Sequence, residues 1–246
     1  MVPTTTVLFA ALAAVVSAAP PCPPPVQYTL PSIGGGAPDL VPPASNLAVK
    51  KIAVGHGIQN YTCGATTDNS VATGAVAVLY DVTSFYPRTR RTGIRQDLWD
   101  SLTSKLLWDT PLPLNKLPGS EYGADPNKPF PSPVADLKLR GVPAAKFLGY
   151  HFFDSNSIPL FDLSSAGLRA AVGKVDSKTA PGNADKGILT TGAVAWLKLD
   201  DNGEGVSQGV TSVFRVITAG GSAQSCSVAG AGVQSVPYAA FYWFYG

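Results

Sequence analysis

Short apolar segments separated by turn-forming residues run through most of this chain. They are rich in Val, Ile, Phe, Tyr and Trp, and most are bounded by Gly, Pro, Asn, Asp or Ser, as β-strands usually are. These segments are residues 47–55, 58–63, 74–82, 145–154, 158–163, 192–199, 211–218 and 237–245. Strands do not alternate regularly with helices, which disfavours a parallel α/β sheet. The sequence therefore predicts a mostly β fold, an antiparallel sandwich or barrel.

One stretch has a helical period instead. Between Gly93 and Trp108, apolar residues recur every four positions, at Ile94, Leu98, Leu102 and Leu106. That spacing is typical of one face of an amphipathic helix. The residues that follow, 111–143, are rich in proline and polar side chains and predict a long surface loop. We expect the helix and the loop to form one helical, proline-rich insertion, at about residues 86–145, between two strand-rich parts.

The N-terminus has the pattern of an export signal. The apolar run from Val7 to Val16 is too short to span a bilayer, and small residues follow it up to Ala18. We expect a signal peptide at 1–18, a proline-rich arm at 19–45, and a single β-rich domain at 46–246 that contains the insertion. The mature protein is then extracellular or in the cell wall. No later window is apolar for long enough to suggest a membrane partner.

The charge of the chain is mild. A formal charge of +2 and a pI near 8.4 argue against nucleic acid or anionic lipid as a partner. The basic cluster in 88–95 is interpreted as a solvated surface, with contact to an anion as the alternative.

If the chain is exported, its cysteines can form a disulfide and one of its tripeptides can be N-glycosylated. In an oxidising compartment two of Cys22, Cys63 and Cys226 should pair. The pair Cys63–Cys226 is favoured because both lie beside strand-like segments, whereas Cys22 lies in the proline-rich arm. Asn60 begins the sequon Asn-Tyr-Thr, so it is a candidate for N-glycosylation in a chain that enters the secretory pathway.

A short sequence motif occurs twice in the chain. The pattern T-G-A-V-A-x-L is present at 73–79 and again at 191–197. A duplicated β unit would explain it. Two similar buried strands would explain it equally well, and the sequence leaves both alternatives open.

Several longer motifs carry a resemblance to a known family. They are 55–63 (GHGIQNYTC), 74–81 (GAVAVLYD), 149–153 (GYHFF), 195–199 (AWLKL), 214–221 (FRVITAGG) with Cys226, and 236–245 (VPYAAFYWFY). In this order they resemble the secreted, uncharacterised DUF3455 family of filamentous fungi and some bacteria, from about Lys50 to the end. The resemblance implies secretion and supports Cys63 and Cys226 as a pair. It implies no established activity.

Some members of that family carry the label malate dehydrogenase. The glycine-rich stretches here do not stand between a strand and a helix, as a dinucleotide-binding turn requires. We therefore expect no nicotinamide cofactor.

The two histidines are the candidates for catalytic chemistry. If His56 and His151 lie on adjacent strands, they could form a site with Asp154, three residues beyond His151. Two imidazoles and a carboxylate could hold a metal with open positions for water, or act in proton transfer. The sequence identifies no metal. The plainer interpretation is that both histidines are hydrogen-bonded residues of a β core.

Aromatic side chains are the candidates for binding. Alternation in the last strand puts Tyr238 and Tyr242 on one face and Trp243 on the other. One face must fill the core, while the other could be covered by the insertion or exposed as a sugar-stacking platform together with Trp196. Arg215, inside a strand, needs a partner: Asp81 is the plain expectation and an anionic ligand the alternative.

These features lead to two functional hypotheses. The leading one is a secreted, non-catalytic β protein, at the cell surface or in the surrounding medium, that binds cell-wall glycan or a small molecule. The alternative is a secreted hydrolase or isomerase-like enzyme that uses His56, His151 and Asp154, with or without a metal. Convergence of those three side chains in a pocket would favour the enzyme, and an exposed aromatic strip would favour binding.

Overall fold

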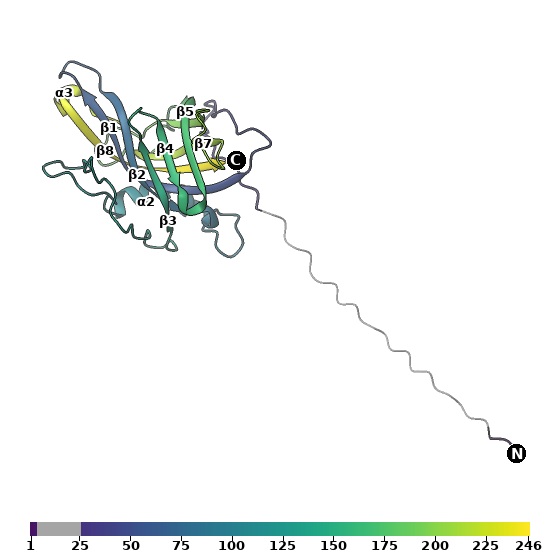
Figure 1. Ribbon diagram of the computed structural model, residues 1–246. Helices are drawn as coiled ribbons and strands as arrows, with labels where there is room; N and C mark the ends of the chain where they lie inside the picture. Colours follow the sequence, from purple (N-terminus) through teal and green to yellow (C-terminus); the bar gives the residue numbers. More distant parts are fainter. Residues whose placement is uncertain (4–25) are drawn as a thin grey trace.

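In the computed structural model, which describes residues 1–3 and 26–246, antiparallel strands form a closed barrel (Figure 1). The strands pair in sequence order, and the last pairs with the first. They are β1 (Val49–Cys63), β2 (Val71–Asp81), β3 (Lys146–Phe153), β4 (Pro159–Leu163), β5 (Leu168–Lys178), β6 (Trp196–Asp201), β7 (Ser212–Gly220) and β8 (Gly232–Tyr245). The mostly β prediction is confirmed, with the barrel as the architecture. The expected signal peptide beyond residue 3, and Cys22, lie outside the described residues.

The seam between β1 and β8 closes the barrel. These two strands pair along nearly their whole length, from Val49 opposite Tyr245 to Cys63 opposite Gly232. Two of the predicted strands, 47–55 and 58–63, are parts of the single strand β1. β5 is a strand that the sequence reading missed.

The barrel wall has an apolar core on each side, because side chains alternate between the faces of a strand. In β8, Tyr238, Tyr242 and Phe244 belong to the cluster inside the barrel. Their neighbours Phe241 and Trp243 belong to a second cluster on the outer face. The outer cluster must be covered by something other than the sheet, and the segments outside the barrel provide that cover.

Short helices between β2 and β3 cover part of the outer face (Figure 1). η1 (Thr83–Phe85) is followed by α1 (Gln96–Asp100) and α2 (Leu102–Asp109), so the predicted helix exists but is broken at Ser101. Trp99 of α1 stacks on Phe241 with ring centroids 4.5 Å apart. Within residues 1–3 and 26–246, none of the helices has the length and apolar character needed to cross a membrane.

The N-terminal arm also packs on the barrel, from residue 26 onward. Leu40 is buried in the outer cluster, and the backbone N–H of Val41 donates to Asp176 of β5 at 3.0 Å. Thr29 donates its N–H to the Tyr86 hydroxyl at 3.1 Å. The described part of the proline-rich arm is therefore packed against the barrel.

One disulfide lies at the end of the β1–β8 seam where Cys63 faces Gly232. Cys63, at the end of β1, is bonded to Cys226 in α3 (Cys226–Ala229), which confirms the favoured pairing.

The remaining short helix, η2 (Ser164–Ala166), links β4 to β5. The two copies of the repeated sequence motif differ in local structure. The first copy, 73–79, lies entirely within β2, whereas β6 begins only at Trp196, near the end of the second copy, 191–197.

Candidate functional site

The structure does not bring His56, His151 and Asp154 together. His56 faces the outer side of the barrel wall, where its Nδ1 lies 3.3 Å from the Thr110 hydroxyl. Thr110 donates its own hydrogen to the Leu106 carbonyl, so the imidazole is the donor in this pair. Burial alone lowers the pKa of His56 to about 4. The side chain is a neutral, hydrogen-bonded residue beneath α2.

His151 lies inside the barrel. Its ring stacks on Phe161 with centroids 4.2 Å apart, and its Nδ1–H donates to the Leu160 carbonyl at 2.9 Å. Burial lowers its pKa to about 4; the hydrogen bond to Leu160 opposes this shift and the charge of Arg215 adds to it. The barrel wall therefore separates the two imidazoles, because alternate residues of a strand point to opposite faces.

Asp154 stabilises a turn through side-chain hydrogen bonds. Its Oδ1 accepts the backbone N–H groups of Asn156 and Ile158, both at 2.9 Å, in the connection between β3 and β4. This is the usual role of aspartate at such a position. Among residues 1–3 and 26–246, no group of three or more His, Cys, Asp or Glu side chains is placed to hold a metal.

The aromatic side chains of β8 are covered on both faces, and the alternative of an exposed platform is not realised there. Tyr238, Tyr242 and Trp243 have no exposed surface, and Tyr238 and Tyr242 share a hydrogen bond of 2.8 Å inside the barrel. Trp243 packs under Tyr86, with ring centroids 5.9 Å apart. The two faces of the strand alternate as predicted, but both faces are core. None of these three side chains can present a ring to a ligand.

Arg215 has a different partner from the one expected. Its Nε and Nη2 donate to the Ala195 carbonyl at 3.1 and 2.9 Å. Asp81 instead binds Lys51 at 2.7 Å, at the β1–β2 edge. A main-chain carbonyl satisfies the guanidinium because β6 begins just beyond Ala195 and leaves that carbonyl free for a side chain.

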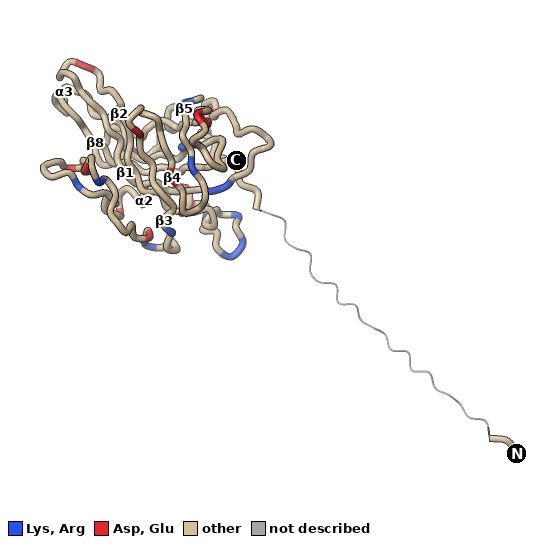
Figure 2. Tube along the Cα trace, viewed as in Figure 1, with Lys and Arg blue, Asp and Glu red and all other residues tan. Residues whose placement is uncertain are grey.

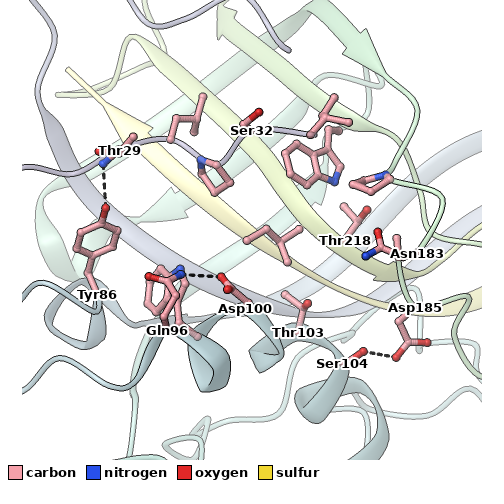
Figure 3. Close-up of a pocket in the computed structure, with 18 residues that line it drawn as sticks. Thr29, Ser32, Tyr86, Gln96, Asp100, Thr103, Ser104, Asn183, Asp185 and Thr218 are labelled. Carbon is pink, nitrogen blue, oxygen red and sulfur yellow. Dashed lines mark hydrogen bonds between the residues drawn. The ribbon is translucent and has the colours of Figure 1, made fainter. Parts of the chain in front are cut away.

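A pocket on the outer face is the best candidate for a functional site (Figure 3). We call it the arm pocket. Its volume is about 620 Å³. The arm forms one wall with residues 29–33, and α1 and α2 form another with Gln96, Trp99, Asp100, Thr103 and Ser104. Tyr86, loop residues between 181 and 185, and Trp196, Ile217 and Thr218 of the barrel complete the lining. Of the predicted binding residues, Trp196 lies here.

The lining of the arm pocket combines hydroxyl, amide and carboxylate groups. Figure 3 shows Gln96 bound to Asp100, and Ser104 bound to Asp185. Burial acts to raise the pKa of Asp185, but hydrogen bonds from Ser104, Gly187 and Trp108 outweigh it and lower the pKa. Asp185 is therefore a fixed carboxylate. Within the described part of the chain, no Lys or Arg lines the pocket.

Basic residues lie elsewhere. Figure 2 shows both signs of charge spread over the molecule. Arg88, Arg90, Arg91 and Arg95, the basic cluster, are exposed, and Arg95 pairs with Asp97 at 2.8 Å.

Two local features of the barrel wall are unusual at this pocket. Trp196 is only 3% exposed, and its indole Nε1 has no hydrogen-bond partner among the described residues. Buried polar groups without a partner are uncommon in proteins. Ile217 has a φ of 47°, which is rare for a β-branched residue, at an irregularity in the β7–β8 pairing. Strained backbone tends to occur at functional sites.

Sequence reasoning missed most of the arm pocket. The arm, α1 and the 181–185 loop are distant along the chain, and their polar residues occur in no recognisable motif. The alternation of Val26, Tyr28 and Leu30 with the polar residues Gln27 and Thr29 is the one local signal that the arm has a packed face.

The family comparison agrees with the resemblance. The sequence model of a family described as "Protein of unknown function (DUF3455)" matches residues 43–246. No curated protein and no solved structure matches the chain. The match covers the whole barrel, from just before β1 to the end of β8. The chain therefore belongs to the DUF3455 family of proteins of unknown function.

Proposed function

We propose that this protein is a secreted, non-catalytic binding protein whose arm pocket takes a neutral saccharide unit of a glycan. The observation that carries the proposal is the chemistry of the lining: hydroxyl, amide and carboxylate groups surround a cavity of about 620 Å³, without a basic residue among the described lining residues. Small-molecule pockets typically have volumes of roughly 300–1,000 Å³. On this proposal, residues 86–145 are an insertion that supplies the α1–α2 wall.

A neutral saccharide suits these groups. Each sugar hydroxyl donates one hydrogen bond and accepts others, and Asn183 offers both an amide donor and an acceptor at the edge of the pocket. Asp100 and Asp185 can accept from hydroxyls through charge-assisted hydrogen bonds. The same two carboxylates would repel an anionic ligand, because like charges disfavour each other in a partly buried site.

Catalysis is not part of this proposal. The enzyme hypothesis needed His56, His151 and Asp154 in one concave site, and each of these side chains has a structural partner of its own in a different place.

The test is a binding measurement on the secreted protein, first across a glycan array and then by calorimetry with the best neutral oligosaccharide. Asp100→Ala and Asn183→Ala should each weaken binding by about tenfold, the usual effect of losing one good hydrogen bond. Asp97→Ala is the matched control, since Asp97 lies on the same helix, is exposed, and is outside the pocket. Failure of any neutral saccharide to bind, or equal affinity in all three variants, would overturn the proposal.

A further inference from the structure

A second cavity, larger than the arm pocket, lies near the end of the β1–β8 seam where Cys63 faces Gly232. Its volume is about 970 Å³, and we call it the Asn60 groove because Asn60 of β1 forms part of its lining. Neighbouring strands and the loop before β3 supply the rest, including Ser235, Gly74, Phe130, Tyr150 and Phe152. The proposed function does not use this groove.

The groove contains half-buried aromatic rings. Phe130 lies against Tyr150 with centroids 4.1 Å apart, and its centroid is 6.4 Å from that of Phe152. Their surface remains partly open to the groove, in contrast to the fully buried rings of β8. Aromatic rings of this kind present an apolar face on which the C–H face of a sugar can pack.

Asn60 is the first residue of the sequon Asn60-Tyr61-Thr62 and is half-buried at the groove. Its Oδ1 accepts a hydrogen bond of 2.8 Å from Ser235 on β8. On the other side its cross-strand neighbour is Gly74, so no side chain stands beside Asn60 on β2. The carbonyl end of the amide is therefore held by Ser235, and Asn60 lines the groove beside Gly74.

We propose that Asn60 carries an N-linked glycan whose first sugars lie in the Asn60 groove against Phe130, Tyr150 and Phe152. In the attachment step, Nδ2 forms a bond to C1 of the first sugar of a lipid-diphosphate-linked oligosaccharide. The bond from C1 to the diphosphate oxygen breaks, and the proton from Nδ2 leaves with the diphosphate. The product amide keeps its carbonyl, so the hydrogen bond from Ser235 to Oδ1 survives.

The protein thus supplies its own ligand for this groove. A covalently attached sugar has a high effective concentration at a nearby surface, so even weak stacking is enough to keep it bound. The proposal rests on the predicted export of the chain and is independent of the arm pocket.

The occupancy test uses the full chain placed behind a secretion signal in a yeast host, which removes any dependence on the chain's own signal. Intact mass should exceed the protein mass by one N-glycan, and both Asn60→Gln and Thr62→Ala should lose that increment. A secreted wild-type protein with the bare mass, or with an increment that survives both substitutions, overturns the proposal.

The docking test follows release of the glycan by an endo-β-N-acetylglucosaminidase under native and denaturing conditions. We expect native release to be at least about tenfold slower. Phe130→Leu and Phe152→Leu, which keep apolar volume but remove the ring, should accelerate native release several-fold. Tyr28→Leu is the control, because Tyr28 is a half-buried aromatic residue of the arm outside this groove. Equal native rates in the wild type and both groove variants would show that the glycan does not dock there.

Discussion

Acidification should destabilise this protein well above the pH at which carboxylates titrate. In the folded state burial holds the pKa of both His56 and His151 at about 4, below the ordinary 6.5. The unfolded chain therefore binds more protons than the folded one between these values. The stabilisation is complete above about pH 6.5 and is lost as the pH falls toward 4.

The size of the effect follows from the two pKa values. Lowering one pKa from 6.5 to about 4 corresponds to roughly 3 kcal/mol per histidine. The two histidines lie on opposite sides of the barrel wall and share no partner, so their contributions should add to roughly 6–7 kcal/mol. Since domains are stable by only about 5–15 kcal/mol, this is a large share of the total.

The assay is urea unfolding at half-unit steps from pH 7.5 to 4.5. The free energy of unfolding should fall by roughly 2.7 kcal/mol per pH unit in the steep part of the range. His56→Gln and His151→Gln cannot charge, so each should remove about half of that slope even though it lowers stability at neutral pH. A free energy that is flat between pH 7 and 4.5, or a slope unchanged in both variants, would refute the reasoning.

Two further predictions concern the barrel itself. The Cys63–Cys226 bond spans a sequence separation of 163, and closing such a loop stabilises a protein by about 5 kcal/mol in the chain-entropy model. The double variant Cys63→Ala, Cys226→Ala should therefore melt roughly 10–20 °C lower in calorimetry; a loss under about 3 °C would contradict this. A Cβ added to Gly57 would lie 2.0 Å from the Val76 carbonyl oxygen, whereas one added to Gly173 meets nothing within 4 Å. Gly57→Ala should cost about 3 kcal/mol or more and Gly173→Ala less than about 1 kcal/mol, and similar melting temperatures would show that the strands can separate to admit the methyl group.

The barrel strands were largely predictable because each has a local pattern of apolar, β-branched and aromatic residues that is typical of a strand. In β8, β-branched and aromatic residues alternate between faces, and the alternation holds even though both faces are buried. β5 was missed because it carries the charged residues Arg169, Lys174 and Asp176 and has only three buried residues, of which two are small alanines. Those features weaken the apolar signal on which strand prediction depends.

The candidate site was much less predictable. His56 and His151 are on neighbouring parts of the sheet, but an offset of one residue in the register decides which face each occupies, and register is a long-range property. The arm pocket depends on where residues 29–33 dock, which no local pattern specifies. Trp196 was selected as an aromatic in a strand, yet its place in a pocket results from the arm and helices packed beside it.

The pairing of β1 with β8 has a consequence for synthesis. A ribosome delivers β1 about 180 residues before its partner β8, so the emerging chain carries an unpaired sheet edge until the final strand is released. Contacts this far apart in sequence form slowly. Folding in the cell should therefore depend on chaperones that shield the unpaired edge of the nascent β1. A chain truncated before Gly232 would lack β8, so the barrel could not close and the edges of β1 and β7 would stay unpaired and prone to aggregation.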